Sequence, residues 1–523
     1  MLKYINICNC QDLSRGDIMA VKITTAAFTG IDGALVSVEV DIGRGLPCFN
    51  IVGLPDTSVK ESKERVRAAI VNSGFDFPVS KIVINLAPAD IKKVGALFDL
   101  PIAIGILIAT EQILFEDAEK FLIMGELSLS GELKRVRGVL PIAIEGIKNN
   151  INNYILPQYN AEECSVVKET NVYPFENLKQ VVEYIKYRDL MPYEYKEQKN
   201  QIEGRLDFED ILGQESCKRA VEVAAAGNHN LLMIGPPGSG KTMIAQRVPT
   251  ILPSLSYEEG LEVTKIYSVS GNLDGTKGLM QDRPFRTPHH MTTSIALIGG
   301  GSNLVPGEVS LAHNGVLFLD EVLEFKKNVL EVLRQPLEDR VIKICRTSGT
   351  VTYPSNFMAI IATNPCPCGY YGSSKQCTCS DYERKRYIGK LSGPLLDRID
   401  LFTFVNSLSF KELQCKTKGE SSKNIRKRVE KAREIQKNRF EKEQIYSNAQ
   451  MDGRLIKKYC KLNNKSNKII EKIYNRYSLS TRAYSRILKV ARTIADLNER
   501  EIIEESDIIE ALQYRRFLNE EII

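Results

Sequence analysis

The sequence contains no apolar run that is long enough to cross a membrane. Its longest one, Leu100 to Thr110, lies between Asp99 and Glu111, whereas a membrane-spanning helix needs about 20 apolar residues. No charged-then-apolar signal peptide opens the chain. We therefore expect a cytoplasmic protein that does not enter the membrane, with Leu100 to Thr110 forming a buried helix.

The chain also lacks the even cysteine framework of a disulfide-linked secreted domain, although it has twelve cysteines. In a reducing cytoplasm, thiols serve burial, metal binding or chemistry. Tryptophan is absent, which excludes nothing, and histidine is scarce, with four residues. The adjacent His289 and His290 could contact DNA or could simply pack.

With 523 residues the chain is too long for a single hydrophobic core, and we expect two to four domains. The net charge of +5 is unevenly distributed, because the part from Lys411 onward holds 27 Lys and Arg against 17 Asp and Glu. A basic C-terminal region suggests an anionic partner, but a solvated helical surface explains the same charge equally well.

Changes in composition and periodicity predict a multidomain α/β protein. A distinct extension precedes Met19, which could be the true start, and mixed strands and helices follow. A polar linker leads into a second mixed α/β region, and the Lys/Glu-rich remainder has helical periodicity with few glycines or prolines. The predicted segments are 1–18 (extension), 19–190 (N-terminal domain), 191–205 (linker), 206–410 (α/β core) and 411–523 (all-helical domain).

The strongest motif is the stretch NLLMIGPPGSGKTMIAQRV, in which a strand, Leu231 to Ile234, leads through a G-x-x-x-x-G-K-T loop into a helix. Glycines let backbone N–H groups converge on a phosphate, and the helix N-terminus adds a positive dipole. Lys241 would contact the β- and γ-phosphates, and the Thr242 hydroxyl would ligate Mg²⁺. The loop itself consists of Gly235, Pro236, Pro237, Gly238, Ser239 and Gly240.

Two further strands end in polar residues that a nucleotide-hydrolysing site needs. The run GVLFLDE ends in Asp320, which would hold Mg²⁺ through water, and Glu321, which would polarise the attacking water. The run FMAIIATNP ends in Asn364, beside the expected γ-phosphate. For Asp320 and Glu321, the alternative interpretation is a strand that simply ends in two solvated carboxylates.

Arg398, in GPLLDRIDLF, lies between two aspartates. It could form a structural ion pair. It could also be a finger that reaches the γ-phosphate of a neighbouring subunit and neutralises charge in the transition state.

The order of these motifs, followed by SLSTRAYSRILKVARTIADL, resembles the AAA+ ATPases and, within them, the magnesium-chelatase-like group. The stretches FRTPHHMTTSIALIGGGSNLVPGEVSLAHNGVLFLDE and NPCPCGYYG are similar to the bacterial competence-protein family of the ComM or YifB type. The resemblance runs from Met19 to about Leu512. It implies an AAA+ core with a parallel sheet and a helical C-terminal lid. It also implies the Walker A pair Lys241 and Thr242, the Walker B pair Asp320 and Glu321, sensor 1 Asn364, the trans arginine finger Arg398 and sensor 2 Arg482.

The same resemblance implies an ATP- and Mg²⁺-dependent motor that forms a homo-oligomeric, hexameric ring. Its expected partner is single-stranded or branched DNA, on which it would act as a helicase or branch-migration factor in recombination or natural transformation. The hairpin expected over 340–353, turning at Ser348-Gly349, matches one that faces the ring pore, and Lys343 and Arg346 would contact DNA phosphates. The alternative is a chelatase-like ATPase that remodels a metal-inserting or other protein partner. A scaffold that binds ATP without turnover is disfavoured by Glu321 and Arg398.

The N-terminal domain resembles the proteolytic domain of Lon proteases, an α+β fold of the ribosomal S5 domain 2 type. Those enzymes use a Ser–Lys pair, and the aligned positions here hold Leu97 and, approximately, Leu140. We therefore expect a Lon-like fold without proteolytic activity, serving in ring assembly or substrate docking.

Four cysteines lie within the stretch NPCPCGYYGSSKQCTCS, as two C-x-C pairs. Its Pro, Gly, Tyr, Ser and Lys residues are typical of a loop, so burial as small apolar residues explains the thiols poorly. Two short C-x-C arms can close on one structural Zn²⁺, although C-x₂-C is the usual spacing. A redox-active or incidental thiol cluster is the alternative. The candidate ligands are Cys366, Cys368, Cys377 and Cys379.

Overall fold

A computed structural model describes the chain over residues 20–195, 206–274, 278–301, 304–346, 349–373, 375–407, 419–477 and 479–515. It forms two compact units, residues 1–197 with 271–278 and residues 198–270 with 279–523. The predicted extension, most of the predicted linker and the predicted boundary at 410/411 lie outside the described residues. Within those residues, no helix has both the length and the apolar character that crossing a membrane requires.

The first unit contains a mixed four-stranded sheet in the order β1-β2-β4-β3. Strand β2 alternates between its two faces, and the side that buries Val36, Val38 and Val40 faces a core of apolar residues. The apolar helix α2 packs on β1 and β2, close enough that a Cβ at Gly105 would lie 2.6 Å from Val40 Cγ2. The elements are β1 (Val21–Thr29), β2 (Asp32–Gly43), β3 (Cys48–Val52), β4 (Lys81–Ala87), α1 (Thr57–Asn72) and α2 (Asp99–Ala109).

A parallel three-stranded sheet, β5-β8-β9, completes the first unit with three helices and a small β6–β7 ladder. Leu97 and Leu140, at the positions expected to replace the Ser–Lys pair, are both buried. Buried leucines at these positions support packing and offer no nucleophile. The elements are β5 (Phe121–Ile123), β6 (Glu126–Leu127), β7 (Leu133–Lys134), β8 (Asn153–Pro157), β9 (Asn171–Phe175), α3 (Val139–Lys148), α4 (Ala161–Ser165) and α5 (Leu178–Tyr187).

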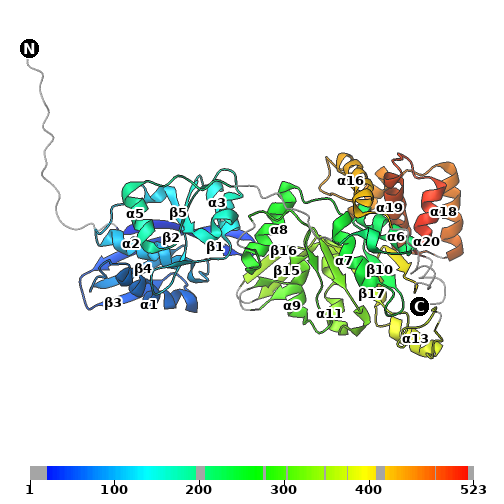
Figure 1. Ribbon diagram of the computed structural model, residues 1–523, viewed down its shortest axis with the longest axis horizontal. Coiled ribbons are helices and arrows are strands. Elements are labelled where there is room, and N and C mark those ends of the chain that lie inside the picture. Colours follow the sequence, from blue (N-terminus) through cyan, green and yellow to red (C-terminus); the bar gives the residue numbers. More distant parts are fainter. Residues whose placement is uncertain are drawn as a thin grey trace, which may run out of the picture. The chain divides into compact units, whose positions relative to one another are not determined.

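The second unit is built on a parallel five-stranded sheet in the order β11-β14-β17-β10-β18 (Figure 1). Its strands are short and apolar, and all residues of β10, β14 and β17 are buried, as expected for a parallel sheet covered on both faces. The mixed α/β architecture with a parallel sheet is therefore as predicted. The strands are β10 (Leu231–Ile234), β11 (Phe285–Arg286), β14 (Val316–Leu319), β17 (Met358–Thr363) and β18 (Leu401–Phe404).

Helices and two hairpins surround this sheet. The hairpin β15–β16 pairs in the antiparallel sense predicted for residues 340–353, although its turn, 347–348, lies outside the described residues. The helices are α6 (Glu215–Gly227), α7 (Lys241–Ile251), α8 (Tyr257–Ser270), α9 (Ser294–Ile298), α10 (Glu308–Leu311), α11 (Lys327–Glu331), α12 (Arg334–Asp339), α13 (Asp381–Ile388) and α14 (Gly393–Leu396). The hairpins are β12 (Gly299–Gly300) with β13 (Val305–Pro306), and β15 (Val341–Arg346) with β16 (Gly349–Pro354).

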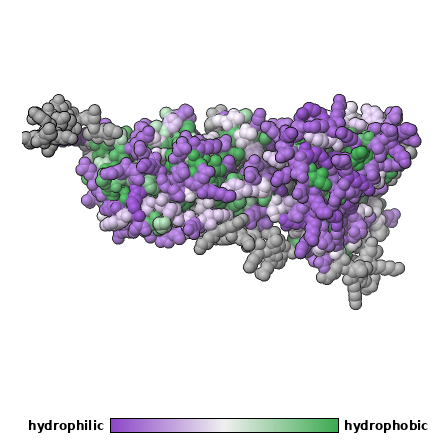
Figure 2. All heavy atoms as spheres, turned by 90° about the horizontal axis from the view of Figure 1, so that it is seen from above, coloured by the Kyte–Doolittle hydropathy of each residue, from purple (hydrophilic) through white to green (hydrophobic). Residues whose placement is uncertain are grey.

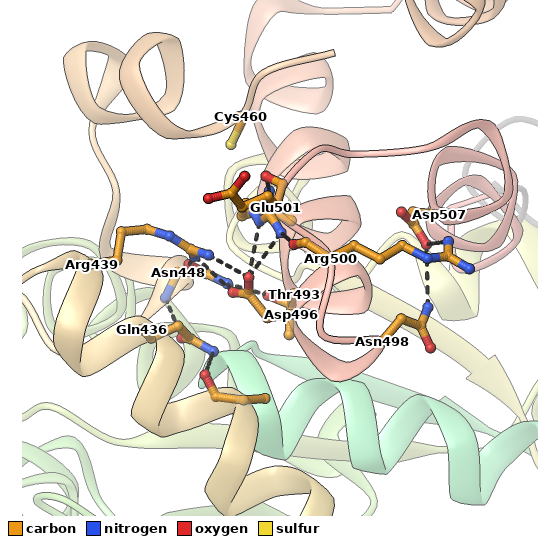
Figure 3. A network of polar contacts seen from close by, with 12 residues as sticks. Gln436, Arg439, Asn448, Cys460, Thr493, Asp496, Asn498, Arg500, Glu501 and Asp507 are labelled. Atoms are coloured by element: carbon orange, nitrogen blue, oxygen red, sulfur yellow. Dashed lines mark hydrogen bonds and ion pairs between the residues drawn. The ribbon is translucent and has the colours of Figure 1, made fainter. Parts of the chain in front are cut away.

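The C-terminal helices lie beside α6 and share one hydrophobic core with the parallel sheet (Figure 1). A buried polar network also fastens them together (Figure 3). Asp496 accepts from Arg439, Arg492 and Asn448, and Gln436 donates to the carbonyl of Ala226 at the end of α6, 2.9 Å away. The helices are α16 (Ser422–Arg439), α17 (Gly453–Tyr459), α18 (Asn464–Tyr477), α19 (Thr481–Leu497) and α20 (Glu505–Gln513).

Candidate functional site

The carboxyl ends of β10, β17 and β14 bring the predicted phosphate-site residues together. Strand β17 pairs with β10 on one side and β14 on the other, so Asn364 lies between the phosphate loop and the Asp-Glu pair. Lys241 Nζ donates to Asn364 Oδ1 at 3.2 Å, and Thr242 Oγ1 donates to Asp320 Oδ2 at 2.7 Å. Residues from three strands that are far apart in the sequence therefore form one polar site.

The loop has the backbone conformation that its glycines were expected to permit. Gly238 and Gly240 have φ values of 75° and 92°, in the left-handed region that side chains disfavour. Gly235 lies so close to β18 that a Cβ would be 2.3 Å from the Val405 carbonyl oxygen. The Ser239 hydroxyl is buried without a hydrogen-bond partner among the described residues, so the loop has an unused polar atom for a ligand.

Lys241 is the cation at the centre of this site, with 8% of its surface exposed. Its ammonium group donates to the carbonyls of Gly235 and Pro236, at 2.7 and 2.9 Å. Burial lowers the pKa of Lys241, while the nearby Asp320 and Glu321 carboxylates oppose that shift. A largely desolvated ammonium at a helix N-terminus is suited to bind a phosphate oxygen.

Glu321 has a strained backbone, with φ at 47°, and an exposed side chain. Its N–H donates to Asp320 Oδ1 at 2.9 Å, and Asp320 Oδ2 accepts from Thr242, so both oxygens of the Asp320 carboxylate are hydrogen-bonded. A non-glycine residue in the left-handed region is uncommon and is often found at functional sites. The Asp320 carboxylate thus contacts the Thr242 hydroxyl, while the side chain of the neighbouring Glu321 is exposed.

The two predicted arginines lie at the opposite edge of the sheet. Asn230 immediately precedes β10, and its side-chain amide donates to the Arg398 carbonyl at 2.9 Å. The phosphate loop follows the other end of this four-residue strand, about 13 Å away at 3.3 Å per residue. Arg482 lies at the same edge as Arg398, with Nη1 3.6 Å from Asp397 Oδ2.

A cavity of about 380 Å³ lies beside these arginines, and Arg398, Arg482, Arg486, Glu338, Asp397 and Asp400 are among its lining residues. Arg398 donates to Glu338 and, at 2.6 Å, to the Pro394 carbonyl. Within the single chain, Arg398 therefore forms an ion pair, as one of its two interpretations predicts. Its position excludes contact with the phosphate loop of the same chain in this conformation.

The four cysteines converge, as the zinc hypothesis requires. Their sulfur atoms all lie within 4.8 Å of one another, and Cys366 Sγ is 3.4 Å from Cys368 Sγ and 3.7 Å from Cys377 Sγ. A tetrahedral Zn²⁺ with four thiolates separates its sulfurs by about 3.8 Å, from a Zn–S bond of about 2.3 Å. The N–H of Cys368 donates to Cys379 Sγ at 3.4 Å, as at a site that stabilises thiolates. The donor set therefore fits a structural zinc ion.

The cysteine loop touches the phosphate loop. Gly369 has a φ of 84°, and a Cβ at this position would lie 2.7 Å from Pro237 Cδ. Cys366 is fully buried, while the other three cysteines are partly exposed. The sequence did not indicate this contact, although the glycine after the first C-x-C pair was the available signal.

The remaining candidates are exposed or packed. Lys343 and Arg346 are both exposed on β15. Lys343 lies on the face opposite to the buried isoleucines of this strand, whereas Arg346 follows them on their own face at the end of the strand. His290 lies edge-on to Phe325 at 6.5 Å, and His289 is exposed and accepts from the Met291 N–H. The packing interpretation therefore suits His290.

Comparison with known proteins identifies the family. Families described as subunit ChlI of Mg-chelatase, magnesium chelatase subunit ChlI, and its C-terminal part match residues 38–160, 207–413 and 419–515. The competence protein ComM of Haemophilus influenzae is 43% identical over 499 residues, which cover 94% of this chain and 97% of that protein. The chain belongs to the ComM/YifB family of magnesium-chelatase-like proteins.

Other relatives agree with this assignment to the ComM/YifB family. The uncharacterized protein YifB of Salmonella typhimurium is 42% identical over 499 residues, covering 94% of this chain and 96% of that protein. Lon protease 2 of Bacillus subtilis is 29% identical over 145 residues, 26% of either chain. The similarity to Lon proteases is therefore partial.

We expect Lys241→Ala to abolish ATP binding, because it removes the buried cation of the phosphate loop. Glu321→Gln should retain ATP binding and lower turnover about 10²- to 10⁴-fold, the usual contribution of a general base. Binding of a fluorescent ATP analogue and phosphate release measure the two effects separately. Normal turnover in Glu321→Gln would show that this carboxylate does not polarise the water.

Proposed function

We propose that this chain is a Mg²⁺-dependent ATPase that forms a hexameric ring, as the family resemblance implies, and moves along single-stranded or branched DNA. The observation that carries this proposal is that the predicted phosphate-binding residues and the two predicted arginines lie at opposite edges of the parallel sheet. One edge holds the phosphate loop with Asp320 and Asn364, and the other holds Arg398 and Arg482. A chain with both halves at opposite edges can complete its site by stacking on a second copy.

In the proposed site the chain's own residues bind and orient ATP. The loop N–H groups, the Ser239 hydroxyl and Lys241 hold the phosphates, and Thr242 with Asp320 would hold Mg²⁺. When bound, Mg²⁺ neutralises charge on the phosphate oxygens. Glu321 accepts a proton from the attacking water, and Asn364 orients that water beside the γ-phosphate.

The arginines complete the site from the neighbouring subunit. Arg398 stabilises the charge that develops on the γ-phosphate in the transition state, and Arg482 acts at the same interface as sensor 2. Both side chains are paired with carboxylates in the single chain, Arg398 with Glu338 and Arg482 with Asp397. In a ring these pairs exchange a carboxylate for a phosphate, so turnover depends on assembly.

DNA is the proposed substrate of the motor. Lys343 and Arg346 are exposed on the hairpin β15–β16. This hairpin is hydrogen-bonded to the hairpin β12–β13, because the Tyr353 hydroxyl donates to the Leu304 carbonyl at 2.7 Å. Hydrophilic residues cover most of the visible face of the C-terminal helices (Figure 2), whose sequence is basic. The relative in Haemophilus influenzae is named a competence protein, which favours a role in natural transformation or recombination.

A chelatase-like ATPase that remodels a protein partner is the second candidate. The family descriptions that match this chain carry the name of a magnesium chelatase subunit. The two candidates share the ATP site and differ in what stimulates it, so the response of ATP turnover to DNA distinguishes them.

We further propose a structural Zn²⁺ held by Cys366, Cys368, Cys377 and Cys379. The loop that carries these thiols begins two residues after Asn364 and touches Pro237 through Gly369. A closed four-thiolate site has no open position for catalysis. Its role is to hold the segment between Asn364 and Arg398 in one conformation.

The DNA proposal predicts that forked or single-stranded DNA strongly stimulates ATP turnover. Lys343→Glu/Arg346→Glu should remove that stimulation and leave the DNA-independent rate unchanged, because the hairpin lies outside the ATP site. The charge-matched control Lys179→Glu/Lys186→Glu, on the exposed side of α5, should keep it. An unstimulated parent protein would favour the chelatase-like alternative.

The ring proposal predicts that Arg398 acts on a neighbouring subunit. Arg398→Ala should lower turnover about 10³- to 10⁵-fold, as expected for an arginine finger. Mixing it in equal amounts with Lys241→Ala should restore activity at about one quarter of the interfaces, where an intact loop meets an intact finger. Parental turnover in Arg398→Ala alone would remove the finger from the mechanism.

The zinc proposal predicts about one zinc ion per chain in protein purified under reducing conditions without chelator. Removal of zinc should weaken hydrolysis more than nucleotide binding, because Lys241 and the phosphate loop lie outside the metal site. Elemental analysis and the two ATP assays measure these effects. Less than about a tenth of an equivalent of transition metal would contradict the closed site and favour a redox pair.

A further inference from the structure

We propose that Asp400 is a positioning residue, which holds Arg398 and Arg482 together at the edge of the sheet that a neighbouring subunit would contact. This role rests on the proposed trans action of the two arginines. Asp400 comes two residues after Arg398 and is the second of the two aspartates between which Arg398 lies in the sequence. Its buried carboxylate contacts α19, which carries Arg482, and the adjacent residues His229 and Asn230, of which Asn230 is hydrogen-bonded to the Arg398 carbonyl.

The Asp400 carboxylate is surrounded by donors. Arg486 Nη1 lies 2.5 Å from Oδ1, and the Asn230 N–H donates to Oδ2 at 3.2 Å. His229 Nδ1 lies 3.4 Å from the same Oδ2. The side chain is 7% exposed, and an anion this deeply buried is stable only when it is paired.

The backbone around Asp400 fixes the segment that carries Arg398. The Asp400 N–H donates to the Asn230 carbonyl at 3.0 Å, and the Asn230 side chain donates to the Arg398 carbonyl at 2.9 Å. The Asn230 side-chain oxygen also accepts from the Ala359 N–H at the start of β17, at 3.0 Å. The carboxylate thus closes a short hydrogen-bonded loop that ties the Arg398 backbone to two central strands.

The same carboxylate fixes the helix that carries Arg482. Arg486 is four residues after Arg482 on α19, so the two side chains lie on one face of that helix. A second contact lies further along this face, where the Thr493 hydroxyl is 2.8 Å from His229 Nε2. Two successive points of α19 are therefore attached to the segment at the start of β10 through Asp400 and His229.

The charges around Asp400 show why its ionised form is needed. Burial alone would raise the pKa of Asp400, but Arg486 and His229 hold it well below its usual range. Burial lowers the pKa of His229, so the ring is neutral, and one tautomer can donate to Asp400 and accept from Thr493. The other cations that face this carboxylate are Lys489 of α19, Arg340, and Arg515, which donates to the Ile399 carbonyl at 3.0 Å.

Loss of the charge should release α19 from the Arg398 segment without touching the phosphate loop, which lies at the other edge of the sheet. The expected defect is therefore specific. A subunit without this anchor keeps its own ATP site intact and presents misplaced arginines to its neighbour. A misplacement of about 1 Å is enough to lower a rate about 10²-fold.

The test uses Asp400→Asn in the full chain. Its turnover should fall about 10- to 100-fold, while its affinity for a fluorescent ATP analogue should change less than about twofold. Mixed with Lys241→Ala subunits, it should recover activity, because its intact loop then meets intact arginines. The control Asp339→Asn, the same change at an exposed position, should keep the parental rate.

Three outcomes would overturn the positioning role: parental turnover in Asp400→Asn, lost ATP affinity, or no recovery in the mixture although both variants assemble. If Asp400→Asn does not fold, Arg486→Gln tests the same contact from a residue whose side chain is 20% exposed, and it carries the same predictions. If the unchanged chain does not hydrolyse ATP, the proposed function itself fails. If it does and Asp400→Asn matches it, only the positioning role fails.

Discussion

The common direction of the five strands in the second unit determines where its chemistry can occur. Because the strands are parallel, all their carboxyl ends meet at one edge, and all their amino ends meet at the other. Lys241, Asp320 and Asn364 each follow a strand, so they are brought together. Arg398 precedes a strand, so the same constraint keeps it away from them.

The C-terminal helices extend this constraint beyond the sheet. They share the hydrophobic core of the sheet, and their buried network of Arg439, Asp496 and Asn448 stiffens the helices around α19 (Figure 3). Because α19 is anchored at the amino edge, Arg482 lies next to Arg398 rather than beside the phosphate loop. In the proposed ring, a movement of the C-terminal helices would therefore displace the arginines offered to a neighbouring subunit before it changed the chain's own phosphate loop.

Much of this site could be predicted from the sequence, because strand-loop-helix order and polar residues at strand ends are local patterns. The phosphate loop, the Asp320-Glu321 pair and the place of Asn364 between them follow from such patterns. Contacts between distant segments left no comparable signal. The anchoring of Arg486 by Asp400 joins residues 86 positions apart, and the contact of Gly369 with Pro237 depends on how a loop folds back. Both contacts depend on the packing of segments that are far apart in the sequence, and the spacing of residues within a local motif does not predict such packing.

The segment that contains the four cysteines connects the two edges of the sheet. Its first cysteine lies two residues after Asn364, its four sulfur atoms lie within 4.8 Å of one another, and Gly369 touches Pro237 of the phosphate loop. A glycine is required at the contact, because any side chain would displace the proline. The loop then continues through α13 and α14 toward Arg398, at the opposite edge. One covalent segment therefore connects the phosphate-binding edge of the sheet to the arginine-bearing edge. Under the two proposals made above, a zinc ion held by the four thiolates would restrain the end of this segment at the phosphate loop, and Asp400 would restrain the other end.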